Sequence, residues 1–190
     1  MFTRNNICFF ALIFLNLGFS EIYAQQNWLN SGGSKGNDEA LDNCIDKNGN
    51  VYSTGYFSLS AKFGNDVLSS SGSGDIFITK QNTSGNYVWA IKAGGANSDR
   101  SYGIATDTAG NIYVTGVFSG TAIFGNFTLS SYNGTQDIFV AKIDPSGNFI
   151  WVKQFGGSDI DVSASIDVDS AGNSVITGRF RGTSLFDSFS

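Results

Sequence analysis

One phrase, repeated at a fixed interval, constrains the fold of this chain more than any other feature of its sequence. The phrase has the form Asp-x-x-Gly-Asn and leads into a short run that ends in Thr-Gly. It begins at Asp46, Asp107 and Asp169, so the period is about 62 residues. A second phrase, Asp-Ile-Phe, keeps the same period at Asp75 and Asp137. A fixed period of this length indicates a repeat architecture in which like units stack against one another.

Each unit is expected to contain four short strands joined by two tight turns. In the second copy the strands are predicted at residues 101–107, 111–118, 137–143 and 149–155. Asp favours the first position of a type I turn and Gly the last, which predicts turns from Asp107 to Gly110 and from Asp144 to Gly147. The matching turns of the other copies contain Asp46, Gly49, Asp169 and Gly172. Residues 119–136, with Phe124 as an anchor, predict a small exposed hairpin that decorates its own unit.

The third strand of each unit indicates how the units are arranged. Its residues 138–141 are all apolar in the second copy, and a strand that is covered on both faces has this pattern. Gly-rich turns between such runs are typical of all-β proteins. We therefore predict a β-propeller, a ring in which each four-stranded sheet lies between two neighbours. An open β-solenoid is the alternative, although its repeats are usually shorter.

Three Trp residues fall at matching places on the fourth strand. They are Trp28, Trp89 and Trp151. We expect their rings to pack between blades, with a sugar-stacking surface as the alternative. The fourth-strand position of Trp28 also shows that the repeat starts out of phase, because no earlier strand of its unit precedes it.

The first 24 residues have the layout of a secretory signal peptide. Arg4 precedes an almost wholly apolar run at residues 7–18, and Ala24 supplies the small residue at the expected cleavage site. A transmembrane helix would need about 20 apolar residues, which makes an uncleaved anchor the weaker alternative. We expect export, either to the cell surface or into the medium, and no membrane association after cleavage.

The expected mature chain, residues 25–190, divides into parts of unequal completeness. Residues 25–33 match a lone outer strand, 34–95 the first copy, 96–157 the second and 158–190 an incomplete third. These parts amount to about two and a half blades, whereas a propeller ring typically needs four to eight. We therefore expect a ring that is not closed in this fragment, and missing C-terminal blades that belong to the same chain.

Composition excludes several classes of function. The chain contains no His, which removes His-based catalysis and the commonest transition-metal ligand. Its net charge is −5 without a basic stripe, which argues against nucleic acid and anionic membranes as partners. Cys8 lies in the expected signal peptide, so the mature chain has one Cys and no internal disulfide. That residue, Cys44, is expected to be a small buried filler.

Repeated acidic residues are candidates for a metal site. Asp38, Asp99 and Asp161 each stand eight residues before the Asp of the first turn. As an acidic ring at one mouth of a propeller they could bind Ca²⁺, which takes oxygen ligands. The alternative is that each carboxylate accepts hydrogen bonds from the backbone of its own turn. Repetition in every copy favours this alternative, because a binding site usually breaks the symmetry of its repeats.

Several linked motifs resemble the bacterial β-propeller repeat family called SBBP. They are Gly-Asn-Ile-Tyr-Val-Thr-Gly at residues 110–116, Asp-Ile-Phe-Val-Ala-Lys-Ile-Asp-Pro-Ser-Gly-Asn at 137–148 and Trp-Val-Lys-Gln-Phe-Gly-Gly at 151–157. The resemblance covers residues 26–190. It implies a secreted or surface propeller, frequently joined to other extracellular modules, and supplies no common set of catalytic residues.

The leading hypothesis for function is a non-catalytic extracellular scaffold or binding module. Its partner would be a protein or a glycan that the sequence does not name, and no cofactor is expected beyond the weak indication of Ca²⁺. The alternative is a polysaccharide hydrolase or lyase. Such an enzyme needs two carboxylates in unlike environments, whereas the acidic residues singled out above recur in every copy. A third hypothesis is a fragment with no function of its own, whose exposed strand edges make it prone to aggregate.

Overall fold

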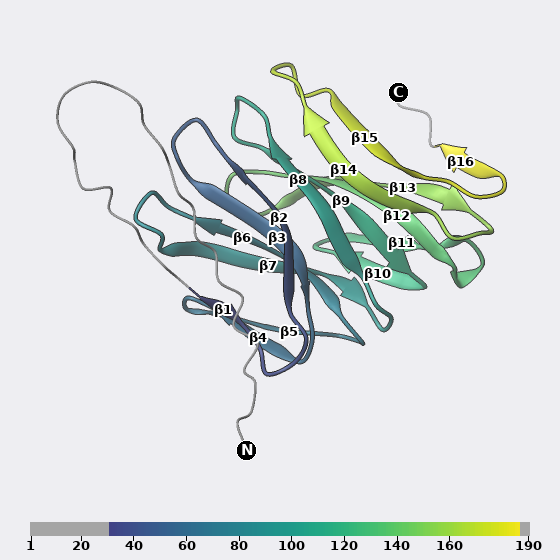
Figure 1. The fold of residues 1–190 in the computed structure, drawn as a ribbon, viewed down its shortest axis with the longest axis horizontal. Coiled ribbons are helices and arrows are strands. Elements are labelled where there is room, and N and C mark those ends of the chain that lie inside the picture. The colour runs from purple at the N-terminus through teal and green to yellow at the C-terminus, as the bar shows by residue number, and fades with distance from the viewer. Residues whose placement is uncertain (1–30, 187–190) are drawn as a thin grey trace.

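The computed structural model describes residues 31–186, which form antiparallel β-sheets that stand side by side (Figure 1). The strands are β1 (Gly32–Gly33), β2 (Glu39–Ile45), β3 (Val51–Phe57), β4 (Ser60–Phe63), β5 (Asp66–Ser69), β6 (Asp75–Gln81), β7 (Tyr87–Gly95), β8 (Arg100–Thr106), β9 (Ile112–Ser119), β10 (Thr121–Phe124), β11 (Phe127–Ser130), β12 (Gln136–Ile143), β13 (Phe149–Gly157), β14 (Val162–Val168), β15 (Ser174–Arg179) and β16 (Ser184–Phe186). A single-turn 3₁₀ helix, η1, spans Tyr132–Gly134. Within the described range, no helix is long and apolar enough to cross a membrane. The predicted signal peptide and Trp28 lie outside the described residues.

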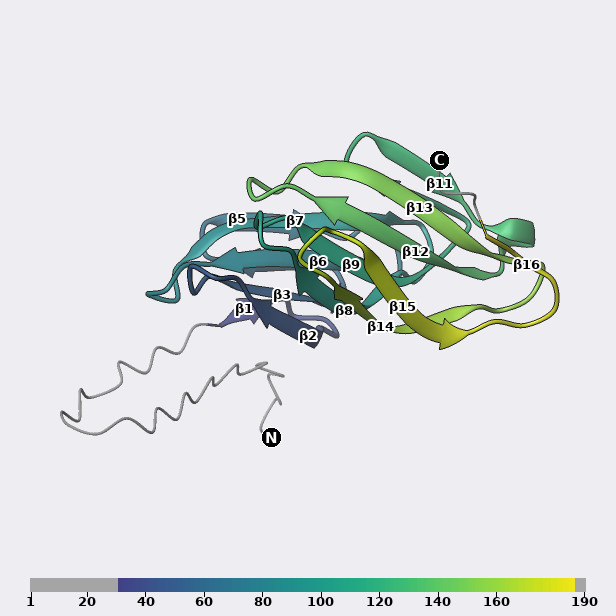
Figure 2. The same ribbon diagram turned by 90° about the horizontal axis from the view of Figure 1, so that it is seen from above.

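Each complete copy folds as an antiparallel meander of four strands, as the repeat predicts. The first copy supplies β2, β3, β6 and β7, the second supplies β8, β9, β12 and β13, and the third begins with β14 and β15. β8 packs against both β2 and β14, so the first strands of the three copies lie next to one another. Figure 2 shows these inner strands along one side of the molecule, with β11 and β13 on the opposite side. This is the arrangement of propeller blades, and the ring is not closed within residues 31–186.

The insert of each copy forms the predicted hairpin but not in the predicted place. β10 and β11 extend the sheet of the first copy, because β10 pairs with β11 on one side and with β7 of the first copy on the other, and not with the four-stranded sheet of its own copy. The same register recurs for β4 with β1 and for β16 with β13. The expectation of a hairpin that decorates its own unit is therefore wrong. The fourth strand of a copy would otherwise present an unpaired edge, and the insert of the next copy covers that edge.

The core lies between the sheets, where each sheet contacts its neighbours on both faces. Phe139 and Ala141 of β12 belong to a buried cluster shared with the first copy, which includes Ile76 and Ile78. The alternate residues, Ile138 and Val140, belong to a second cluster shared with Ile166 and Ile176 of the third copy. Because side chains of a strand alternate between faces, this division confirms that the third strand is covered on both sides. Cys44 is a free thiol that packs against the first cluster.

Candidate functional site

The three Asp residues that were candidates for an acidic ring bind the backbone of the junctions between copies. Asp99 accepts a hydrogen bond from the Gly95 N–H at 2.7 Å and another from the Ser119 N–H at 3.1 Å. Asp38 and Asp161 accept the corresponding bonds from Ser58 and Arg181. Asp99 and Asp161 are completely buried, so they cannot form an exposed ring. Their geometry corresponds to the backbone-binding alternative, and it ties the turn after one copy to the end of the second strand of the next.

A conserved backbone geometry accompanies these carboxylates in all three copies. Gly33, Gly94 and Gly156 have φ values of 146°, 141° and 154°, a region that residues with a Cβ rarely adopt. A Cβ on Gly94 would lie 2.9 Å from Asp99 Oδ2. Glycine is therefore required at this position, both for the backbone conformation and because the carboxylate takes the space of a side chain.

Sequence reasoning missed a second carboxylate at each junction. Asp75, which begins the Asp-Ile-Phe phrase, lies beside Gly94 together with Asp99, and Asp137 lies beside Gly156 in the same way. Burial raises the pKa of Asp99 to about 6, and the nearby charge of Asp75 also acts to raise it. In the sequence the Asp-Ile-Phe phrase indicates only the start of a strand, because its Asp meets the other junction Asp only where the two sheets pack. Within the described residues, no group of three or more His, Cys, Asp or Glu side chains is arranged to hold a metal ion.

The predicted turn residues form one repeated hydrogen-bonded structure. In the second copy Asp107 Oδ1 accepts the Asn111 N–H at 2.9 Å, and Asp107 Oδ2 accepts the Asn111 side-chain amide at 2.8 Å. The Gly110 N–H donates to the Asp107 carbonyl at 3.0 Å. The turns that contain Asp46, Gly49, Asp144, Gly147, Asp169 and Gly172 have the same bonds. These Asp residues therefore hold turns together and are not free to act on a ligand.

The two described Trp residues lie at contacts between copies. The Trp89 ring packs 6.0 Å from the Tyr52 ring, and its Nε1–H donates to the Pro145 carbonyl of the next copy at 3.2 Å. Trp151 packs 6.1 Å from the Tyr113 ring, in the cluster that joins the second copy to the third. Both Trp rings are partly buried in these contacts, which leaves no flat pair of exposed rings for stacking a sugar.

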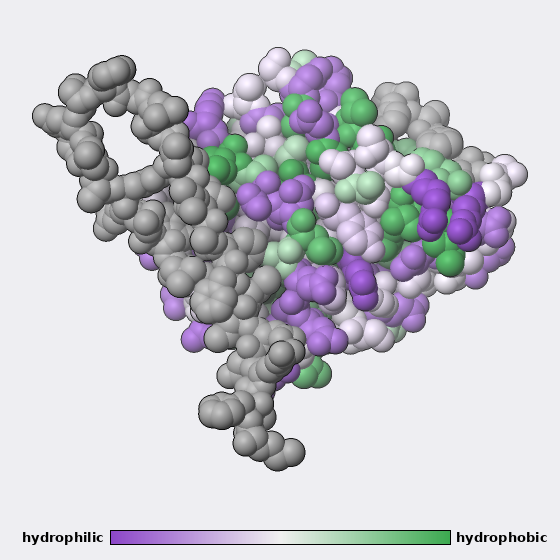
Figure 3. Space-filling view, in the orientation of Figure 1, coloured by the Kyte–Doolittle hydropathy of each residue, from purple (hydrophilic) through white to green (hydrophobic). Residues whose placement is uncertain are grey.

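The inner strands carry side chains that the repeat does not impose. We define the inner-strand surface as Glu39, Tyr56, Arg100 and Tyr102, at the ends of β2, β3 and β8. The Arg100 guanidinium lies 4.4 Å from the centroid of the Tyr56 ring. Burial and then the neighbouring Glu39 carboxylate raise the pKa of the Tyr56 hydroxyl. Figure 3 shows the face formed by the inner strands, on which polar and apolar areas alternate at short range.

The inner-strand surface breaks the symmetry of the copies. Where the first copy has Glu39, the second has Arg100 and the third Val162. Where the first copy has Tyr56, the others have Val117 and Arg179. The neighbouring junction Asp, by contrast, is identical in every copy. In the sequence, the signal for this surface is the difference between the copies at these equivalent positions.

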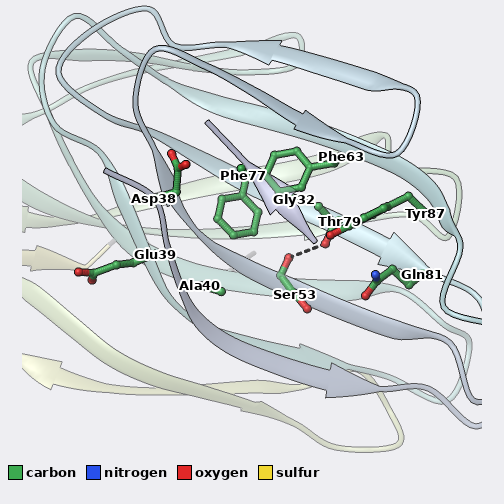
Figure 4. A pocket seen from close by; sticks show the side chains of 11 residues that line it. Gly32, Asp38, Glu39, Ala40, Ser53, Phe63, Phe77, Thr79, Gln81 and Tyr87 are labelled. Atoms are coloured by element: carbon green, nitrogen blue, oxygen red, sulfur yellow. Dashed lines mark hydrogen bonds between the residues drawn. The ribbon is translucent and has the colours of Figure 1, made fainter. Parts of the chain in front are cut away.

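A small cavity opens beside the inner strands, between β1 and the sheet of the first copy (Figure 4). It is lined by Asp38, Ala40, Ser53, Phe63, Phe77 and Tyr87, among others. Its volume is about 10 Å³, which is room for a single water molecule at most. Figure 4 shows the Thr79 hydroxyl bonded to the Ser53 carbonyl across it. The cavity is therefore a packing gap and not a ligand pocket.

Comparisons with known proteins agree with the architecture. Residues 88–117 match the family model of the SBBP β-propeller repeat, over the stretch that runs from the last strand of one copy into the first two of the next. The chain is also 34% identical over 112 residues to an uncharacterized WD repeat-containing protein of Acanthamoeba polyphaga mimivirus. That alignment covers 55% of this chain and 8% of the viral protein. It is therefore a similarity between repeats and not between whole proteins. The family match identifies residues 88–117 as a β-propeller repeat of the SBBP type.

Proposed function

We propose that this protein is an exported, non-catalytic β-propeller binding module, and that a protein or glycan ligand docks on the inner-strand surface. The observation that carries the proposal is the contrast between positions within the repeat. The junction Asp is identical in all three copies, whereas the exposed or partly exposed positions of Glu39, Tyr56 and Arg100 on the inner strands carry different residues from copy to copy. Packing explains the first set, and binding is a reason for the second set to differ.

The chemistry of the inner-strand surface favours a ligand that carries acidic groups. Arg100 presents a planar guanidinium, which forms paired hydrogen bonds with carboxylates and phosphates. Tyr56 supports one face of that guanidinium and restricts its orientation, which lowers the entropy that binding must remove. Tyr102, which is partly exposed on β8 together with Arg100, adds an aromatic ring and a hydroxyl.

A binding assay on the full-length chain tests this proposal. The protein would be screened on an array of acidic and neutral glycans and against extracellular protein extracts, followed by affinity measurement for any ligand found. We expect Arg100→Ala to weaken binding at least tenfold, about 1.4 kcal/mol. The matched control Lys35→Ala removes an exposed cation outside the inner-strand surface and should leave binding unchanged. Equal affinity of both variants would overturn the assignment of the surface.

The carboxylate arrangement does not favour the alternative of a polysaccharide hydrolase or lyase. The two carboxylate pairs of the junctions, Asp75 with Asp99 and Asp137 with Asp161, are completely buried. A glycosidase needs two carboxyl groups that flank a substrate bond, and a sugar cannot reach these pairs. Turnover of a polysaccharide by the purified protein would contradict the non-catalytic proposal.

Export is a separate part of the proposal, which the layout of residues 1–24 supports. Expression of the full-length chain in a host that secretes proteins, followed by N-terminal sequencing of the exported product, tests it directly. We expect the product to begin at Gln25. A product that keeps Met1 and remains inside the cell would overturn this part and leave the binding proposal intact.

A further inference from the structure

The two complete junctions bury the same pair of carboxylates in different surroundings. Asp75 and Asp99 lie beside Gly94, and Asp137 and Asp161 lie beside Gly156, with all four side chains completely buried. A Cβ on Gly156 would lie 2.6 Å from Asp137 Oδ1 and 3.0 Å from Asp161 Oδ2. These two oxygens therefore face the same small space, which is open because Gly156 has no side chain.

At the first junction the protein supplies its own cation. The Lys92 ammonium lies 2.9 Å from Asp75 Oδ2, and the Ser70 hydroxyl donates to Asp75 Oδ1 at 3.0 Å. The Ser71 N–H also donates to Oδ2, at 3.0 Å. Both oxygens of Asp75 are thus hydrogen-bonded, and the ammonium offsets one of the two negative charges that the pair would carry.

At the second junction the two side-chain partners are lost, and only the main-chain bond is kept, from the Tyr132 N–H to Asp137 Oδ2 at 2.9 Å. Gln154 stands where the first copy has Lys92, and its neutral amide donates to Asp137 Oδ2 at 2.6 Å. Ser131, the counterpart of Ser70, instead accepts a hydrogen bond from the Gly120 N–H at 2.8 Å. The insert of this copy is one residue longer and includes η1, so the chain reaches Asp137 along a different path. Asp137 Oδ1 has no hydrogen-bond partner within the described residues, although it is buried.

A buried carboxylate oxygen without a donor is costly, and a second carboxylate beside it adds to the cost. We propose that the second junction binds a divalent cation of the Ca²⁺ class between Asp137 Oδ1 and Asp161 Oδ2, where it takes the charge-balancing role that Lys92 has at the first junction. Two carboxylates match the charge of such an ion, and hard cations prefer oxygen ligands. No third acidic, His or Cys side chain of residues 31–186 joins the pair, so the other ligands are main-chain oxygens or water. The site differs from the acidic ring expected from the sequence, because Asp137 comes from the other repeated phrase.

The rival explanation is a proton, because a like charge nearby favours the neutral form of a carboxyl group. Burial raises the pKa of Asp137, and the charge of Asp161 acts in the same direction. A proton would satisfy Asp137 without any metal. A metal site predicts that Ca²⁺ stabilises the chain at neutral pH, whereas a proton predicts no effect of Ca²⁺. The Lys found at the first junction supplies a substitution that distinguishes the two.

The experiment compares thermal unfolding of the full-length chain in EDTA and in 1 mM CaCl₂ at pH 7.5, with a Tb³⁺ luminescence titration as a direct measure of binding. For the wild-type chain we expect Ca²⁺ to raise the unfolding midpoint by about 3 to 6 °C, as an ion at roughly ten times its dissociation constant would. Gln154→Lys installs the side chain of the first junction. It should raise the midpoint in EDTA and abolish both the Ca²⁺ shift and the Tb³⁺ signal.

Two further variants keep the test decisive. Asp137→Asn removes one ligand and should also abolish the Tb³⁺ signal, whereas the matched control Lys92→Gln alters the other junction and should retain it. The proposal is overturned if Ca²⁺ leaves the wild-type midpoint unchanged. It is equally overturned if the shift persists in both Gln154→Lys and Asp137→Asn, or if acidification alone stabilises the wild-type chain while Tb³⁺ does not bind.

Discussion

At the scale of single residues, the turn Asp residues should differ in their contribution to stability according to their surroundings. Asp107 Oδ2 also accepts the Tyr113 hydroxyl at 3.2 Å and lies 3.7 Å from the Lys142 ammonium. Asp144 holds an equivalent turn that is more exposed to water. We expect Asp107→Ala to lower the free energy of unfolding by about 2 kcal/mol and Asp144→Ala by about 1 kcal/mol. Urea denaturation of both variants measures the difference, and a larger effect at Asp144 would contradict it.

The junction Asp should give stability a pH dependence opposite to that of the turn Asp residues. Burial raises the pKa of Asp99 to about 6, above the value of about 3.9 expected in the unfolded chain. Between these two values the native state binds more protons than the unfolded state, so stability falls as pH rises from about 4 to 6. The turn residue Asp144 has a lowered pKa because the Asn148 amide and N–H bind its charged form. That contribution is present above pH 4 and is lost on acidification.

Removal of the Asp99 carboxyl group isolates this dependence. We expect the free energy of unfolding of Asp99→Asn to decrease less between pH 4 and 6 than that of the wild-type chain, by up to about 2 kcal/mol. Urea denaturation at several pH values gives the comparison. Asp159→Asn, at an exposed position in the next junction, serves as the control and should follow the wild-type curve. Parallel curves for Asp99→Asn and the wild-type chain would count against a raised pKa.

At the scale of elements, the insert hairpin is part of the core that joins two copies. Phe124 of β10 is completely buried, and its ring centroid lies 4.8 Å from that of Phe139 and 5.9 Å from that of Phe149. Ile123, the preceding residue on β10, is 56% exposed. We expect Phe124→Ala to cost about 3 to 5 kcal/mol and Ile123→Ala less than about 0.5 kcal/mol. Chemical denaturation of the two variants checks this. A small loss of unfolding free energy in Phe124→Ala would mean that the hairpin does not contribute to the core.

The sequence predicts the strands of this fold better than it predicts their partners. The period and the Asp-x-x-Gly-Asn turns define four strands per copy, and the run at residues 138–141 indicates that the third is covered on both faces. The partner of the insert did not follow from these patterns. A period describes each copy in the same way, but it does not say which of two neighbouring sheets an edge strand joins. The pairing of Ile123 with Gly94 depends on the packing angle between copies, which is a three-dimensional property.

For the candidate sites, too, the sequence predicts single residues better than it predicts which residues meet. The Asp99 carboxylate can be recognised as a repeated feature of the inter-copy turn, and its repetition favours binding to backbone N–H groups. Its neighbour Asp75 could not be recognised, because the two lie on different phrases and meet only through the fold of the junction. The inner-strand surface was missed for another reason. Arg100 and Tyr56 are informative because they do not repeat, and the period of the sequence therefore does not indicate these positions.

At the scale of the whole molecule, the described residues end in an open stack, with consequences for behaviour in solution. β15 pairs with β14 and with no other strand of residues 31–186, and its Val175 is 68% exposed. A cleft of about 220 Å³ lies between β13 and β15, lined in part by Trp151, Ile176 and Phe180. An unpaired strand beside an apolar cleft is a template for pairing with another chain. A polypeptide limited to residues 1–190 should therefore associate with itself as its concentration rises.

A charge on the open edge should suppress this association without weakening the fold. Val175→Lys places an ammonium group at an exposed position of β15, and natural edge strands use Lys in this way to prevent pairing. We expect the wild-type chain to form dimers or larger species between about 1 and 100 μM, and the variant to shift this onset to at least tenfold higher concentration with an unchanged unfolding midpoint. Ile123→Lys, at a position 56% exposed on β10, which is paired on both sides, is the matched control and should leave association unchanged. Sedimentation velocity over this concentration range distinguishes the cases. If both variants associate as the wild-type chain does, the contact lies elsewhere than on β15, because a buried ammonium at the strand pairing would have to lose its hydration without a partner.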